Sequence, residues 1–168
     1  GRTGVCDGTV GPGATNLVSP LAEAYCSSIP MIAIVSDIAT TWEHRRERGN
    51  ASQAMYQMDM FKTVSKWQVT VSNPAALEDT IEAAFRVATT GKPGPVVVCV
   101  PVDVGAANFD FKDRKKPGLG AIYPGSRSAP DPEDVKRACQ AILDAKKPVL
   151  VVGGGAHISG CYSQIRNL

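Results

Sequence analysis

Apolar runs and helical patterns alternate along the first hundred residues. Residues 31–35 and 96–100 are continuously apolar, which is typical of strands covered on both faces in a parallel sheet. A shorter strand is predicted at residues 5–10. Apolar positions recur at helical spacing within residues 16–26 and 73–88, which predicts two helices. This alternation predicts an α/β fold with a doubly wound, mostly parallel sheet.

The pattern breaks between residues 105 and 130, where glycine and proline are frequent. The stretch includes a basic cluster at residues 112–116, for which we favour a solvated surface over a phosphate-binding role. We therefore predict an interdomain linker over residues 105–130. It would separate a first domain at residues 1–104 from a second at residues 131–168.

A new helix is predicted to begin at the start of the second domain. Asp131 is placed to cap it, and Pro132 suits its first position. Residues 148–152 are apolar and rich in valine, which predicts a strand that turns at residues 153–155. One helix and one strand bury too little apolar surface to close a core. We therefore expect this second α/β domain to be incomplete, or to be completed by another chain.

Composition argues against several classes of function. The formal net charge is only +2 and aromatic residues make up 6% of the chain, so a nucleic-acid partner is not expected. No stretch has the apolar length that a membrane span requires. The five cysteines are odd in number and form no C-x-x-C pair, which disfavours a zinc site or a disulfide framework. We expect buried, reduced thiols at Cys6 and Cys99, and hence a reducing compartment.

The strongest candidate for chemistry is the hexapeptide Gly-Pro-Gly-Ala-Thr-Asn at residues 11–16. It follows a predicted strand and precedes a predicted helix, an arrangement that forms ligand sites in open α/β sheets. Glycines around Pro12 fix a tight turn and let a ligand approach the backbone. The alternative is that the turn only connects two elements, with Thr9 and Asn16 capping the helix.

Residues 4–18, which include this hexapeptide, resemble the pyrimidine-binding domain of thiamine diphosphate enzymes of the acetolactate synthase type. The resemblance continues in order through residues 21–35, 85–98 and 145–155. It implies that residues 1–104 form the distal part of that pyrimidine-binding domain. It also implies that residues 131–168 begin the family's middle domain.

The resemblance implies a set of site residues. Thr9, Gly11, Pro12 and Asn16 would line the pocket for the aminopyrimidine ring of thiamine diphosphate. Gln53 would correspond to the family's glutamine that faces the active site. The implied substrate is a 2-oxo acid, and the implied reaction is decarboxylation or carboligation. A homodimer or homotetramer is expected, with the coenzyme at the subunit interface.

Other parts of the family's site find no match here. The family glutamate that bonds the aminopyrimidine lies upstream of the hexapeptide, and Asp7 is not at the matching place. The domain that binds diphosphate and Mg²⁺ has no counterpart in these 168 residues. We therefore expect the Mg²⁺ ligands to lie outside this chain and the chain alone to be inactive. A cytoplasmic location is expected, or an organellar one in a eukaryote.

Three positions depart from the acetolactate synthase pattern. Ser52 and Ala54 flank Gln53 where the family carries Phe-Gln-Glu, and Val102 stands where acetolactate synthases usually have lysine. These departures put acetolactate formation itself in doubt. They fit an alternative hypothesis, a non-catalytic regulatory or scaffolding relative that keeps the fold.

Two further segments carry candidate chemistry. The charged run at residues 43–48 could present cations to an anionic substrate, but we favour a solvated or interface helix. The glycine turn at residues 153–155 could cradle FAD or another nucleotide. A Rossmann-type nucleotide binder resting on this turn alone is the third hypothesis. His44 and His157 have no nucleophile partner at a telling position, so a catalytic triad is not expected.

Overall fold

A computed structural model describes residues 2–110, 123–124 and 127–168. The chain divides into two compact units, Gly1–Gly125 and Ser126–Leu168, and each is described by itself. Most of the predicted linker at residues 105–130, including the basic cluster at residues 112–116, lies outside the described residues.

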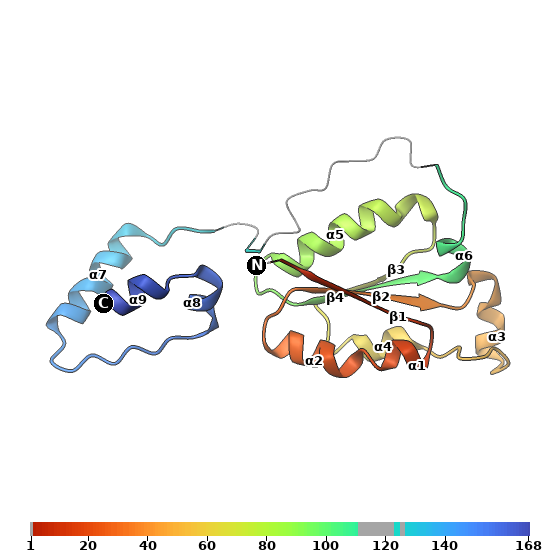
Figure 1. The fold of residues 1–168 in the computed structure, drawn as a ribbon, viewed down its shortest axis with the longest axis horizontal. Coiled ribbons are helices and arrows are strands. Elements are labelled where there is room, and N and C mark those ends of the chain that lie inside the picture. The colour runs from red at the N-terminus through yellow and green to blue at the C-terminus, as the bar shows by residue number, and fades with distance from the viewer. Residues whose placement is uncertain (1, 111–122, 125–126) are drawn as a thin grey trace. The chain divides into compact units, whose positions relative to one another are not determined.

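The first unit is built on one parallel sheet, as the apolar runs predict (Figure 1). Its strands lie in the order β1-β2-β4-β3. Each pairs in parallel with its neighbours, so Val35 stands opposite Cys99 at the centre of the sheet. The strands are β1 Gly4–Gly8, β2 Met31–Asp37, β3 Trp67–Thr70 and β4 Pro95–Pro101. The α/β fold class is thereby confirmed.

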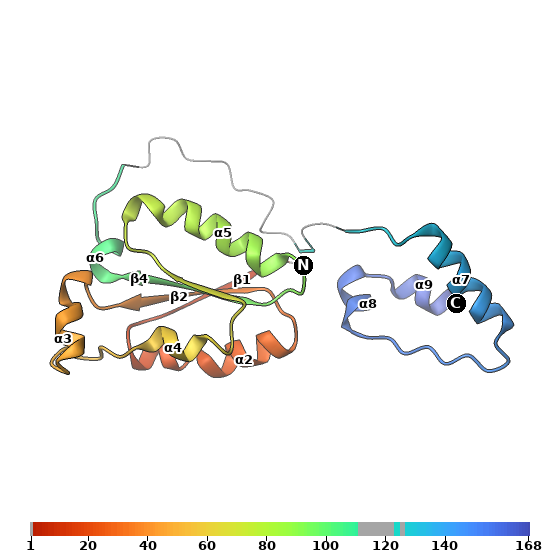
Figure 2. The same cartoon turned by 180° about the vertical axis from the view of Figure 1, so that it is seen from behind.

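Helices cover both faces of this sheet (Figures 1 and 2). On one face lie α1 Pro12–Thr15, α2 Val18–Cys26 and α4 Gln57–Phe61. There Leu21 and Phe61 pack with Val35 and Val97 in one buried cluster. Because burial removes apolar surface from water, this cluster stabilises the packing of the helices on the sheet.

The other face is covered by α5 Leu77–Thr89, preceded by the 3₁₀ turn η2 Pro74–Ala76. Ala84 and Ala88 pack against Val96 and Val98 in a second buried cluster. The Asn73 side chain accepts a hydrogen bond of 2.9 Å from the Ala75 N–H. Asn73 therefore caps the 3₁₀ turn that leads into α5.

Short helical segments follow the carboxyl ends of the two central strands. After β2 come η1 Thr40–Trp42 and α3 Glu43–Glu47, and after β4 comes α6 Val102–Gly105. Figure 1 shows α3 and α6 at the same end of the sheet. Residues that follow different strands are therefore brought to one edge, where ligands bind in open α/β sheets.

The second unit contains α7 Pro132–Asp144, α8 Gly154–Ser159 and α9 Tyr162–Asn167. The Asp131 carboxylate accepts the Glu133 N–H at 2.8 Å, so the predicted cap is present. The strand predicted at residues 148–152 is wrong, because the structure has no strand there. A strand needs a neighbour for its backbone groups, and among the described residues of this unit none is offered. Val149 and Val151 are 86% and 90% exposed.

Two other sequence expectations can be compared with the structure. All five cysteines are free, and Cys99 is fully buried, but Cys6 is only half-buried. Cys6 lies on β1, the edge strand of the sheet, where only one neighbouring strand covers it. Among the described residues, no helix combines the length and apolar character needed to cross a bilayer.

Candidate functional site

The turn after β1 has a backbone that requires glycine. Gly11 has φ +62°, which side chains adopt only under strain. A Cβ at Gly11 would come within 2.5 Å of the Gln53 carbonyl oxygen, and one at Gly13 within 2.3 Å of Thr9 Cγ2. Both glycines of the predicted turn are therefore held close to neighbouring chain. The fold thus places Gly11 beside Gln53, and both residues are predicted for the site.

The polar backbone groups of Gly11 are both satisfied within the protein. Its N–H donates to Gln57 Oε1 at 2.7 Å, and its carbonyl accepts the Thr15 N–H at 3.0 Å. Gly11 is buried, so its contribution to a site is the shape of the turn. The side chains of Thr9, Pro12 and Asn16 are exposed beside it and remain accessible to a ligand.

Gln53 approaches the turn through its backbone, while its side chain is exposed. It adopts φ +59°, an uncommon conformation for a residue with a side chain. The structure therefore joins Gln53 to the Gly11 turn.

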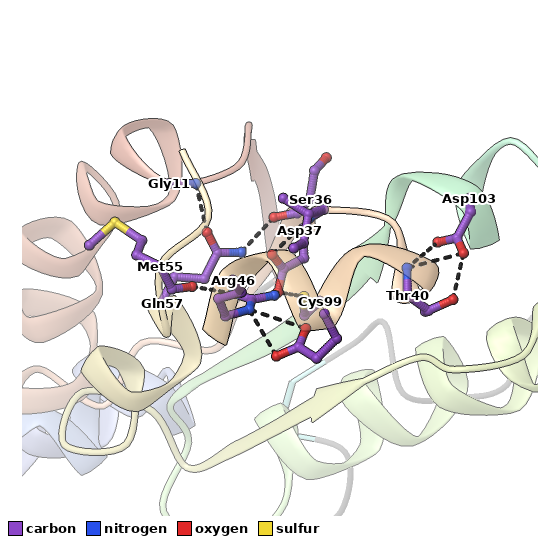
Figure 3. Close-up of polar contacts among 11 residues, drawn as sticks. Gly11, Ser36, Asp37, Thr40, Arg46, Met55, Gln57, Cys99 and Asp103 are labelled. Atoms are coloured by element: carbon purple, nitrogen blue, oxygen red, sulfur yellow. Dashed lines mark hydrogen bonds and ion pairs between the residues drawn. The ribbon is translucent and has the colours of Figure 1, made fainter. Parts of the chain in front are cut away.

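Sequence reasoning missed Gln57, a buried residue that reaches the turn. Its side chain is 0% exposed. Besides accepting from Gly11, its amide donates from Nε2 to the Ser36 carbonyl at 2.5 Å. Figure 3 shows the amide between the turn and the end of β2. The sequence does indicate that Gln57 is buried. Gln57 precedes the apolar Phe61 by four residues, so the two share one face of α4.

Arg46 is an exception within the solvated or interface helix that the sequence predicts at residues 43–48. Its guanidinium pairs with Asp37 at 2.9 Å and Glu43 at 3.0 Å, and its side chain is 6% exposed. It also donates to the Met55 carbonyl and lies over the Tyr56 ring at 5.5 Å. The rest of α3 is exposed as predicted. Ion pairs with the Asp37 and Glu43 carboxylates hold the Arg46 side chain away from solvent.

The charge of Arg46 is secured by these neighbours. Burial lowers its pKa, but the hydrogen bond and charge of Asp37, together with Glu43, outweigh burial and raise the pKa overall. An arginine already paired with two carboxylates has little positive field left for an anion. Arg46 is therefore better suited to hold the loop than to bind an anionic substrate.

Cys99 on β4 is a buried neighbour of Asp37. Its thiol lies 3.9 Å from Asp37 Oδ2 and is fully buried. Burial, and then the charge of Asp37, raise its pKa to about 11. The thiol is therefore protonated near neutral pH and is a poor nucleophile. Asp37, the carboxylate beside the thiol, also lines a pocket of about 210 Å³, together with Glu43, Arg46, Tyr56, Gln57, Met58, Asp59 and Thr70.

A second connection ties together the segments that follow β2 and β4. The Asp103 carboxylate accepts the Thr40 N–H at 3.1 Å and its hydroxyl at 2.5 Å. The Thr40 hydroxyl is the main cause that lowers the pKa of Asp103. Val102, the residue before Asp103, is 51% exposed.

The chemistry that this edge offers is that of a binding wall. Within residues 2–110, 123–124 and 127–168, no cluster of three or more His, Cys, Asp or Glu side chains could hold a metal ion. The turn instead exposes the apolar ring of Pro12 and the polar side chains of Thr9 and Asn16.

The chain is similar to known proteins along its whole length. Residues 1–63 match the family described as thiamine pyrophosphate enzyme, N-terminal TPP binding domain. The chain is 34% identical over its whole length to a probable acetolactate synthase large subunit of Methanocaldococcus jannaschii. It is 39% identical over 99% of its length to the acetolactate synthase large subunit of Corynebacterium glutamicum.

A third relative is the acetolactate synthase of Arthrospira platensis, with 34% identity over the whole chain. The chain spans only 26–28% of the length of these three relatives. The similarity therefore concerns one part of much longer proteins.

Proposed function

We propose that the chain forms part of a thiamine diphosphate-dependent enzyme. The premise is that residues 1–63 match the N-terminal TPP binding domain of thiamine pyrophosphate enzymes. Its substrates would be 2-oxo acids, and its reaction decarboxylation or carboligation. The observation that carries this proposal is the similarity to acetolactate synthases along the whole chain. The Gly11 turn, held at the carboxyl edge of a parallel sheet, supports it.

The residues around the turn would bind one side of the coenzyme's aminopyrimidine ring. Pro12 would supply an apolar surface, while Thr9 and Asn16 would supply polar groups at its rim. Gly11 would set the shape of the turn, since its own N–H and carbonyl are already bonded. When bound, thiamine diphosphate supplies the nucleophilic carbon and the electron sink that 2-oxo acid chemistry requires.

Several finer features rest on the resemblance alone. We propose that the Mg²⁺ ligands and the glutamate partner of the aminopyrimidine come from outside these 168 residues. We also propose a homodimer or homotetramer in the cytoplasm, and Gln53 as a residue that faces the substrate. FAD at residues 153–155 stays a prediction. The expected strand before this turn is absent, and Gly153 is the N-cap of α8.

The proposal is tested on the full-length protein with thiamine diphosphate, Mg²⁺ and pyruvate. Calorimetry should show coenzyme binding, and pyruvate should be consumed with release of CO₂. Replacing Asn16 by alanine should weaken coenzyme binding about tenfold, the equivalent of one lost hydrogen bond. Asn50→Ala, a change at another exposed asparagine, should leave binding unchanged.

The same experiment distinguishes the proposed enzyme from the non-catalytic alternative. A protein that binds the coenzyme but leaves pyruvate and other 2-oxo acids unchanged would favour a regulatory or scaffolding relative. Failure to bind thiamine diphosphate at all would contradict the proposed function.

A further inference from the structure

We propose that Gln57 is a positioning residue for the coenzyme, because its amide holds the Gly11 turn in its binding shape. This inference rests on the proposed function, in which the turn borders the aminopyrimidine ring. It assigns Gln57 no contact with the coenzyme. The role is to fix the backbone that presents Thr9 and Pro12.

The first observation is the pair of hydrogen bonds that the amide makes. Gln57 Oε1 accepts the Gly11 N–H at 2.7 Å, and Nε2 donates to the Ser36 carbonyl at 2.5 Å (Figure 3). Gly11 precedes Gln57 by 46 residues, so the amide joins segments that are distant in the sequence. A primary amide accepts at one atom and donates at the other, which is what these two backbone groups require.

The second observation is that the acceptor of this N–H is a side chain, and in the part of the chain that the structure describes no backbone carbonyl accepts it. Gly11 is buried, so water does not readily replace the amide. A buried donor without an acceptor is costly. Because Gly11 also has φ +62°, a lost bond would let the turn relax toward another backbone conformation. Thr9 and Pro12 would then lose their relative placement.

The third observation is that Gln57 is itself held from both sides. Arg46 donates to the Met55 carbonyl, two residues before Gln57. The same guanidinium pairs with Asp37 at 2.9 Å, next to Ser36. Gln57 and Ser36 are thus kept at a fixed separation by a second, parallel connection. Side chains that orient binding groups are effective when their own geometry is locked in this way.

The test uses the full-length protein and three variants. Gln57→Leu removes both hydrogen bonds, whereas Gln57→Glu keeps an acceptor for the Gly11 N–H. Val98→Ala removes buried apolar volume from the other face of the sheet, against α5, and leaves the turn untouched. Thermal unfolding of the apoprotein and the Kd of thiamine diphosphate with Mg²⁺ are measured for each, at a temperature where every variant is folded.

We expect Gln57→Leu to weaken coenzyme binding about tenfold, as loss of a supporting partner typically does. The KM for the coenzyme should rise in parallel, while kcat at saturating coenzyme should stay within about twofold, because the variant removes no group that touches the substrate. Gln57→Glu should restore binding to within about threefold of the unmodified protein through its retained acceptor. Val98→Ala should unfold at lower temperature with unchanged Kd.

Two results would overturn the proposal. One is unchanged coenzyme affinity in Gln57→Leu. The other is an equal loss of affinity in Val98→Ala, which would show that general destabilisation is the cause. Should Gln57→Leu not fold, Gln57→Asn replaces it, since its shorter side chain cannot reach both partners. Equal affinity in the Asn and Glu variants would then refute the proposal. No coenzyme binding by the unmodified protein would instead overturn the proposed function, and this inference with it.

Discussion

At the scale of single residues, the sheet edge is organised by polar side chains that are buried next to one another. Asp37 accepts the Ile38 N–H at 2.7 Å, pairs with Arg46 and lies beside the Cys99 thiol. Each polar group is acceptable in the interior because a partner satisfies it. The Cys99 thiol is the group of this arrangement whose pKa burial raises most clearly.

We predict that Cys99 makes the protein less stable at alkaline pH. Its pKa rises from 9.0 to about 11 on folding, so the folded state keeps a proton that the unfolded state releases. Between these values the folded state binds more protons, and the free energy of unfolding falls as pH increases. The full loss corresponds to about 2–3 kcal/mol.

Urea unfolding at pH about 8 and about 10.5 measures this change. Cys99→Ala should show a smaller fall than the unmodified protein, because the titrating thiol is gone. The same burial should make Cys99 react with iodoacetamide far more slowly than the exposed Cys26. Identical pH dependence in the two proteins would contradict the prediction.

At the scale of elements, the end of α5 depends on a side chain from the segment before β3. Lys66 Nζ donates to the Val87 carbonyl at 2.5 Å and to the Thr90 carbonyl at 2.7 Å. The last carbonyls of a helix have no partner within it, and a cation there also favours the helix dipole. Burial lowers the pKa of Lys66. Lys66 thereby fastens α5 to the chain that enters β3.

Replacing Lys66 by methionine should destabilise the protein by about 1 kcal/mol, because the carbonyls lose their donor while the aliphatic stem remains. Lys62→Met is the matched control. Lys62 is 63% exposed and pairs with Asp59, which is 64% exposed, so the change should cost less than about 0.5 kcal/mol. Urea unfolding followed by circular dichroism compares the two. A cost for Lys62→Met equal to that for Lys66→Met would be inconsistent with a capping role.

At the scale of the whole molecule, buried residues belong to the first unit. Its two clusters lie on opposite faces of the sheet. Among the described residues of the second unit, none is buried, and residues 149–152 are all at least half exposed. A helix such as α7 that packs on little else is marginal in water. The two units should therefore differ strongly in local stability.

Hydrogen exchange on the 168-residue chain should show this difference. Backbone amides in β4, one of the two central strands of the sheet, should exchange slowest. Amides in α7, α8 and α9 should exchange much faster, because opening them exposes little apolar surface. Mass spectrometry of peptides from both units measures the rates. Protection in α7 equal to that in β4 would require a core in the second unit that the structure does not show.

Local patterns in the sequence predicted much of the fold. The apolar runs at residues 31–35 and 96–100 correspond to two parallel strands, and the cap at Asp131 forms as expected. These features depend on neighbours along the chain, whose spacing can be read directly. The turn at Gly11 could be recognised in the same way, because its glycines and proline restrict the backbone locally.

Only the tertiary structure decided which polar side chains meet at that turn. Gln57 and Arg46 look like ordinary surface residues in the sequence, yet folding buries both against partners on other segments. Residues 148–152 show the opposite case: their valine-rich pattern favours a strand, but no neighbouring strand among the described residues completes it. Pairing across long stretches of chain depends on packing in three dimensions, which residue periodicity does not encode.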